Sequence, residues 1–212
     1  MDTGQYRDTQ LLDIYDACRI ADVQEHMHFV KRPGVAADVS DIGRLLDINT
    51  AYALMSATSK PGITSFWTIE NLESAIAMFD ISLGGDGSGE RFAKRRFMQV
   101  ICVPVIPPLS FAPENCDVID AVVKEGMVPW LISATQSGAT SPASLPGAIV
   151  QGNAEVLASM TAINLASPGA PLLYGNWPLV CDLRTGAVAV SGGESGLMAA
   201  AVGQLARFYD IP

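Results

Sequence analysis

Residues 97–107 read FMQVICVPVIP, and residues 128–136 read VPWLISATQ. Both stretches are apolar throughout, which is the pattern of a β-strand buried on both faces. Between them, residues 113–126 (PENCDVIDAVVKEG) place apolar side chains at helical spacing, with a proline in the first turn and a glycine at the end. Strand, helix and strand in this order form one unit of a parallel sheet covered by helices. These residues therefore predict an α/β fold.

The same alternation of strands and helices extends in both directions along the chain. Further strands are expected over 23–30, 63–69 and 170–177, and further helices over 8–22, 41–58, 71–83, 144–166 and about 197–208, with Ser40, Asn71 and Ser144 at helix starts. The result is about five strand–helix units, which we expect to form a single domain over residues 1–212.

Two architectures fit this order, a doubly wound open sheet and part of a (β/α)8 barrel. A dinucleotide-binding sheet would have G-x-G-x-x-G after its first strand, and the turn after residues 23–30 reads KRPGVA instead. The GGDGSG run at 84–89 follows a helix, so we interpret it as a flexible turn and not as a phosphate cradle. Because five units do not close a barrel of eight, we predict parallel (β/α) units in a partial (β/α)8 TIM barrel.

The composition argues against several classes of partner. The chain carries 13 Lys and Arg against 22 Asp and Glu, a net charge of −9, and 49% of its residues are hydrophobic. A negative surface repels phosphates, so we expect no nucleic acid and no anionic membrane as partner. No apolar run approaches the roughly 18 residues of a membrane span, and the first ten residues lack the pattern of a signal peptide. We therefore expect a cytoplasmic protein.

The cysteines and histidines predict no metal site. Four cysteines lie far apart in the sequence without a CxxC pair, so we expect reduced and mostly buried thiols. His26 and His28 lie close together, but no further ligands occur at a suitable spacing.

Candidate binding residues follow the expected strands, where the loops of a barrel carry its chemistry. The loop after 128–136 is small, polar and uncharged, and it leads into a helix N-terminus that favours an anionic or carbonyl group. The loop after 170–177 combines aromatic side chains with an acid and an arginine. We expect these two loops to line one cleft. The candidate substrate-binding residues are Gln136, Tyr174, Asn176, Trp177, Asp182, Arg184 and Trp67.

Each of these residues also has a structural interpretation. Trp67, Tyr174 and Trp177 could form a cage for a quaternary ammonium through cation–π attraction, or they could pack in the core. Asp182 and Arg184 could balance a substrate's charges, or they could simply pair with each other. The polar loop at 136–142 could bind a ligand or only cap the following helix.

The second half of the chain resembles the trimethylamine methyltransferase superfamily. The most specific stretch is GATSPASLPGAIVQGNAEVLA, Gly138 to Ala158, followed by SPGAPLLYG at 167–175 and DLRTG at 182–186. CVPVIPPLSFAPE at 102–114 and the turn at 58–62 are similar to earlier motifs of that superfamily. The resemblance covers most of the chain, and members are longer at both ends, so it implies a central fragment of a longer member.

The resemblance implies a (β/α)8 barrel and an activity. Members transfer a methyl group from trimethylamine, or from a quaternary amine such as glycine betaine, to the cobalt of a corrinoid on a separate partner protein. The corrinoid is the nucleophile, so no serine or cysteine triad is needed. Placing the amine in a dry site is then the protein's main task.

The sequence also allows other functions. The chain could be an inactive remnant or docking module of such an enzyme. An unrelated barrel lyase would instead need a lysine at a strand end, and only Lys31 lies near one. Because five units leave open sheet edges, we also expect the chain to be marginally stable or a homo-oligomer.

Overall fold

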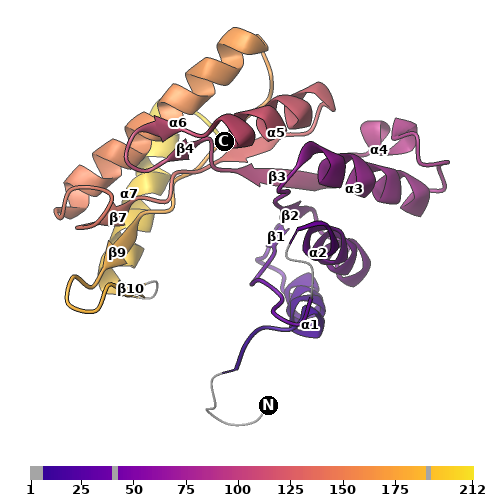
Figure 1. The fold of residues 1–212 in the computed structure, drawn as a ribbon, viewed down its shortest axis with the longest axis horizontal. Helices are drawn as coiled ribbons and strands as arrows, with labels where there is room; N and C mark the ends of the chain where they lie inside the picture. Colours follow the sequence, from indigo (N-terminus) through magenta and orange to yellow (C-terminus); the bar gives the residue numbers. More distant parts are fainter. Residues whose placement is uncertain (1–6, 40–42, 190–191) are drawn as a thin grey trace. The chain divides into compact units, whose positions relative to one another are not determined.

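The computed structural model describes residues 7–39, 43–189 and 192–212. The chain divides into two compact units, residues 1–100 and 101–212, and each is described by itself. Within the described residues, five strands form one sheet in the order β1-β2-β3-β6-β8, and the first three of them are labelled in Figure 1. The neighbouring pairs β1–β2, β2–β3 and β6–β8 are parallel. The predicted α/β class with parallel strand–helix units is confirmed, and the sheet described is not a closed barrel. The prediction of a single domain stays a prediction.

The first unit follows the predicted alternation with shorter strands. The strand predicted over 23–30 begins only at Val30, which pairs with Gly62 of β2, because residues 23–29 are exposed and form turns and irregular backbone. The strand expected over 63–69 ends at Thr64. The expected start of a helix at Ser40 lies outside the described residues. The elements of this unit are α1 Leu11–Asp22, β1 Val30–Lys31, α2 Arg44–Ala57, β2 Gly62–Thr64, α3 Ile69–Ser82, α4 Glu90–Lys94 and β3 Met98–Cys102, which crosses the unit boundary.

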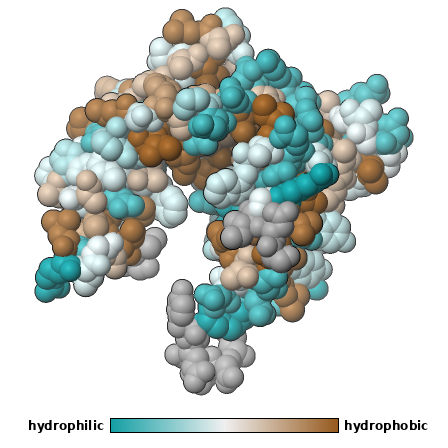
Figure 2. All heavy atoms as spheres, viewed as in Figure 1, coloured by the Kyte–Doolittle hydropathy of each residue, from teal (hydrophilic) through white to brown (hydrophobic). Residues whose placement is uncertain are grey.

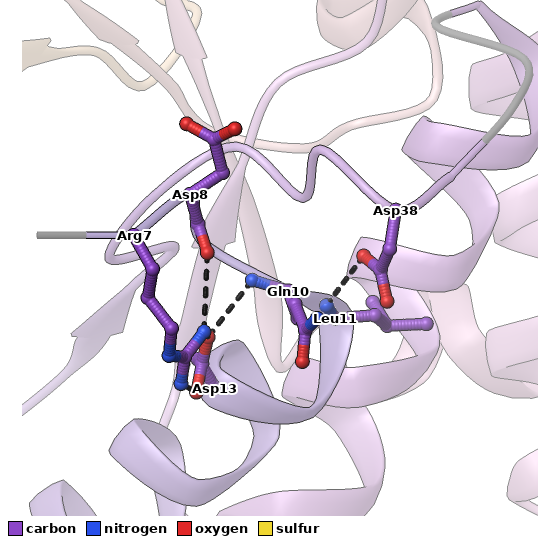
Figure 3. A network of polar contacts seen from close by, with 6 residues as sticks. All are labelled: Arg7, Asp8, Gln10, Leu11, Asp13 and Asp38. Carbon is purple, nitrogen blue, oxygen red and sulfur yellow. Dashed lines mark hydrogen bonds and ion pairs between the residues drawn. The ribbon is translucent and has the colours of Figure 1, made fainter. Parts of the chain in front are cut away.

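Polar contacts fix the start of α1 (Figure 3). The Asp13 carboxylate accepts a hydrogen bond from the backbone N–H of Gln10 at 2.8 Å, as in a capping box. Arg7 binds both oxygens of Asp13, at 2.5 and 2.6 Å, and Leu11 N–H donates to Asp38 at 2.9 Å. The Arg7 hydrogen bond, with that from Gln10, lowers the pKa of Asp13 to about 2.

The cap of α3 differs from the sequence prediction. Thr68, and not Asn71, is the N-cap residue, and its side chain accepts a hydrogen bond from Asn71 N–H at 3.3 Å. Asn71 is instead buried within the helix, where its side-chain amide donates to Asp47 at 2.8 Å. The residue types of an N-cap are present at both positions, and only the packing of Asn71 distinguishes them.

The GGDGSG segment forms a loop around the buried carboxylate of Asp80, and the flexibility expected of this turn stays a prediction. Asp80 accepts hydrogen bonds from the backbone N–H groups of Gly87 at 2.9 Å, Arg91 at 2.7 Å and Phe92 at 3.2 Å. Burial alone would raise the pKa of Asp80, but these N–H donors outweigh it and the net shift is downward. The short helix α4 follows directly from this loop.

The second unit contains the longest helix and several short strands that the sequence did not predict. The expected strand 97–107 ends at Cys102, and a small hairpin follows. The strand predicted over 128–136 is interrupted after Leu131. Gln136, its last residue, belongs to another short strand, β7, in a second sheet of order β10-β9-β7. The elements are β4 Val105–Ile106, β5 Ser110–Phe111, α5 Pro113–Lys124, β6 Pro129–Leu131, β7 Gln136–Ser137, α6 Leu145–Ala166, β8 Leu173–Tyr174, β9 Leu179–Cys181, β10 Val188–Ala189 and α7 Gly193–Tyr209.

Several helix bounds agree with the sequence prediction. Ser144 caps α6 through a side-chain hydrogen bond from Gly147 N–H at 3.3 Å, and α5 begins at the predicted proline. α6 and α7 expose apolar side chains, among them Leu165 and Phe208. Hydrophobic and hydrophilic residues also lie side by side on the face drawn in Figure 2. The expected homo-oligomer stays a prediction.

The cysteines agree with the expectation of free thiols. Cys18 and Cys102 are buried, Cys116 and Cys181 are partly exposed, and none of the four forms a disulfide in the part of the chain described. Burial raises the pKa of the Cys102 thiol to about 12. None of the described helices has the length and apolar character needed to cross a membrane.

Candidate functional site

The two loops that the sequence assigns to one cleft lie side by side in the second unit. β7 and β9 pair in parallel, with Gln136 opposite Leu179. Trp177 N–H donates to the carbonyl of Ser133 at 2.8 Å, and Leu179 N–H donates to that of Thr135 at 2.8 Å. These bonds join the segment after β6 to the segment after β8, and that the two loops line one cleft stays a prediction. The candidate residues of this unit therefore follow neighbouring strands at their carboxyl ends.

A pocket of about 400 Å³ opens beside the segment after β8. One side consists of residues 176–179, and Trp177 is 45% exposed there. The other side is the start of α7, which contributes small side chains. The lining residues are Asn176, Trp177, Pro178, Leu179, Gly192, Ser195, Gly196 and Ala199. A pocket of this volume suits a small molecule.

Asn176 lines this pocket, but its amide group is turned against α6. Both polar atoms of the amide are buried and have no hydrogen-bond partner among the described residues. The amide of Asn176 can lie this close to α6 because residue 152 is glycine: a Cβ at that position would lie 2.4 Å from Nδ2 of Asn176. A buried amide without partners is unfavourable by about 1–3 kcal/mol per group, so this side chain gains from any movement that gives it a partner.

Gln136 begins a tight polar turn. Its carbonyl accepts hydrogen bonds from the backbone N–H groups of Ala139 and Thr140, each at 3.0 Å, and of Ser141 at 3.1 Å. Its own N–H donates to the Thr140 hydroxyl at 3.0 Å. These bonds close the turn on itself, and the cap of α6 is Ser144, which lies beyond this loop. The Gln136 side chain is partly exposed, and its contact with a substrate stays a prediction.

Tyr174 is buried between helices α6 and α7. Its hydroxyl donates to Asn153 Oδ1 at 2.8 Å, and Asn153 Nδ2 donates to the Tyr209 hydroxyl at 2.9 Å. Burial, with a smaller contribution from Tyr209, raises the pKa of Tyr174 to about 12. These contacts show the packing interpretation of this aromatic residue, and its role toward a substrate stays a prediction.

Asp182 and Arg184 pair with each other in the turn between β9 and β10. Their side chains approach to 3.6 Å, and Arg184 N–H donates to the Asp182 carboxylate at 2.9 Å. That backbone hydrogen bond is the main cause of the lowered pKa of Asp182. The structural alternative left open by the sequence is therefore present, and contact with a substrate stays a prediction for both residues.

Trp67 belongs to the first unit, and its side chain is 64% exposed. Its backbone N–H donates to Asp47 at 2.8 Å, and the amide of Asn71 donates to the same oxygen at 2.8 Å. Burial raises the pKa of Asp47, and these donors oppose the shift. A cage made of Trp67 with aromatic residues of the second unit stays a prediction.

Glu155 is the residue that the sequence interpretation missed. It is only 2% exposed, and its carboxylate receives hydrogen bonds from Leu109 N–H at 2.9 Å, from Gln151 Nε2 at 3.0 Å and from the Ser133 hydroxyl. The available signal was its charge, because Glu155 is the only charged residue in the 22 residues of α6. A lone acid in an apolar helix needs buried partners.

The comparison with known proteins adds the family. A sequence model described as trimethylamine methyltransferase matches residues 1–212. The chain belongs to the trimethylamine methyltransferase family. Relatives in this family include trimethylamine methyltransferase MttB1 of Methanosarcina mazei, 32% identical over 200 residues that make up 94% of this chain and 40% of the relative.

Two further relatives show the range of the family. Trimethylamine methyltransferase MttB of Methanosarcina thermophila is 31% identical over 94% of this chain and 41% of its own length. A glycine betaine methyltransferase of Desulfitobacterium hafniense is 28% identical over 99% of this chain and 43% of its own length. The chain thus spans about two fifths of the length of these relatives. The resemblance inferred from the sequence is confirmed at the level of the family.

Proposed function

We propose that this chain takes part in methyl transfer from a methylated amine, trimethylamine or a quaternary amine such as glycine betaine, to the cobalt of a corrinoid carried by a partner protein. The observation that carries the proposal is the family match over residues 1–212. The names of the relatives, which include both trimethylamine and glycine betaine methyltransferases, support this class of substrate.

The pocket after β8 supports the binding of the amine. Its volume of about 400 Å³ suits a small amine and not a corrinoid ring, which agrees with a corrinoid that arrives on another protein. The exposed face of Trp177 can attract an ammonium by a cation–π interaction of about 0.5–2 kcal/mol. The unpartnered amide of Asn176 can turn from α6 toward the ligand and gain a hydrogen bond.

The residues of the chain need only hold and release the amine. A reduced corrinoid supplies the nucleophile when its protein is bound. Protonated trimethylamine and quaternary amines are cations. The nucleophile would form a new bond to the methyl carbon with its own electron pair while the C–N bond breaks and the nitrogen keeps that bond's pair, so the cationic nitrogen becomes neutral. Trp177 binds the cation more strongly than the neutral product, which favours release after transfer. Orientation of one methyl group toward the nucleophile is the main contribution of the pocket.

The test is a demethylation assay. The chain is mixed with a reduced corrinoid protein and with trimethylamine or glycine betaine, and the demethylated amine is measured by mass spectrometry. Trp177→Ala should lower the rate of demethylation. Phe208→Ala is the control: it also removes an aromatic side chain, at a position of α7 that is 80% exposed, and it should leave that rate unchanged. If the chain neither binds nor demethylates trimethylamine or glycine betaine, the proposal is wrong. The cytoplasmic location stays a prediction.

A further inference from the structure

The first half of α6 contacts each of the segments that follow β3, β6 and β8 in the second unit. Gln151 donates a side-chain hydrogen bond to the carbonyl of Thr140 at 2.8 Å. Gly152 packs directly against the amide of Asn176. Glu155 contacts the segments after β3 and β6. The helix turn 151–155 is thus a common support of these three segments, and the segment after β6 also accepts the backbone hydrogen bond of Trp177, which lines the pocket.

Glu155 has the most contacts in this turn. Its Oε1 accepts from Leu109 N–H at 2.9 Å and from Gln151 Nε2 at 3.0 Å, and its Oε2 contacts the Ser133 hydroxyl. The second proton of Gln151 Nε2 goes to the Thr140 carbonyl, which fixes the orientation of that amide. Oε1 therefore receives two N–H donors from different parts of the chain.

The contact with Leu109 holds an unusual backbone conformation. Leu109 has φ of +56°, in the left-handed region that side chains with a Cβ rarely adopt. It lies between β4 and β5, in the loop after β3. Such a conformation is unfavourable by about 1 kcal/mol or more and persists where neighbouring contacts impose it. The hydrogen bond to Glu155 is one such contact, and it joins this loop to α6.

Packing alone does not favour a carboxylate at this position. A buried charge loses its hydration, and an apolar side chain of similar volume often gives equal or greater stability. The three donors are instead spread over two loops and one helix, which suits a role in placing those loops. We propose that Glu155 is a positioning residue that holds the loops after β3 and β6 in the arrangement needed for amine binding. This proposal rests on the function proposed above.

Two conservative variants separate geometry from charge. Glu155→Gln keeps an oxygen for the two N–H donors and can donate its own N–H to Ser133, so it preserves the contacts without the charge. Glu155→Asp keeps the charge but withdraws it by about 1.5 Å, the length of one C–C bond. Both changes are small enough to leave α6 helical. Ser159→Ala is the matched control, because Ser159 is buried on the same helix and, among the described residues, its hydroxyl donates to the helix carbonyl of Glu155 at 2.7 Å and to no loop.

Two readouts decide the proposal, amide hydrogen exchange and the affinity for trimethylamine or glycine betaine by calorimetry. In Glu155→Asp we expect about tenfold faster exchange of Leu109 N–H and about tenfold weaker amine binding, the effect of one lost hydrogen bond. Glu155→Gln should restore both values to within about threefold of the wild type, and Ser159→Ala should change neither.

The outcomes distinguish this proposal from the proposed function. Unchanged exchange at Leu109 in Glu155→Asp overturns the anchoring of the loop. Faster exchange without weaker binding overturns its role in the amine site, and equal losses in the Gln and Asp variants overturn the argument from geometry. If the wild-type chain binds no amine, the proposed function fails and the positioning role fails with it, while exchange at Leu109 still reports whether the loop is anchored.

Discussion

Replacement of Gly152 by alanine tests how tightly the amide of Asn176 is held. The added Cβ would lie 2.4 Å from Nδ2, 2.7 Å from Oδ1 and 2.9 Å from Cγ of Asn176. These distances are about 1 Å shorter than normal van der Waals contacts. The end of the Asn176 side chain must therefore move away from α6.

The expected net effect is an increase in stability. Alanine in a helix interior is favoured over glycine by about 1 kcal/mol. The displaced amide loses no hydrogen bond, because neither of its polar atoms has a partner among the described residues. Movement toward the pocket also lets water reach two buried polar atoms, whose burial is unfavourable by about 1–3 kcal/mol each. We expect the free energy of unfolding to rise by at least about 1 kcal/mol, or about 2–4 °C in Tm.

Thermal denaturation followed by circular dichroism measures this change. Gly203→Ala is the control, because Gly203 lies within α7 and a Cβ there meets nothing within 4 Å. Gly203→Ala should raise the free energy of unfolding only by the difference in helix propensity between alanine and glycine, about 1 kcal/mol. The reasoning is refuted if Gly203→Ala stabilises the protein while Gly152→Ala destabilises it by more than about 1 kcal/mol, the cost of an overpacked site that cannot adjust.

Three further perturbations test other parts of the structure. Asp80→Asn places an amide N–H opposite the backbone N–H of Gly87, so trypsin should cut the following loop faster. The folded state lowers the pKa of Asp80 from 3.8. Its ionised carboxylate therefore stabilises the fold, and this stabilisation is lost as the pH falls below 3.8. At pH 8 iodoacetamide should modify the partly exposed Cys116 in the native protein and Cys102 only after unfolding, as mass spectrometry would show, because burial raises the pKa of Cys102 to about 12. Asn153→Ala leaves two tyrosine hydroxyls without their partner and should lower the free energy of unfolding in urea by about 2 kcal/mol; unchanged stability would contradict the observed bonds.

The sequence predicted the long elements better than the short ones. α5 and α6 begin at a proline and at a serine cap, which are local signals that do not depend on the rest of the fold. The expected strand 97–107 was too long, because an apolar run does not show where pairing stops. Proline lacks the N–H needed to continue a ladder, and the prolines at 104, 107 and 108 mark the hairpin that replaces the end of that strand.

The candidate site was only partly predictable. Parallel strands end at the same edge of a sheet, so the sequence order was enough to bring the segment after β6 beside Trp177. The sequence could not decide whether Tyr174 and Asp182 contact a substrate or another part of the protein, because each side chain can make a hydrogen bond or ion pair with either.

The sequence by itself determined the α/β class, the order of its strands and helices and the resemblance to the family. These properties follow from apolar periodicity, capping residues and local motifs, each of which depends on only a few neighbouring residues. Only the tertiary structure decided which polar groups meet. Glu155 and Leu109 are 46 residues apart, and their contact exists because α6 packs against the loop after β3. Hydrogen bonds depend on the distance and direction between groups, and for groups far apart in the chain these are set by packing.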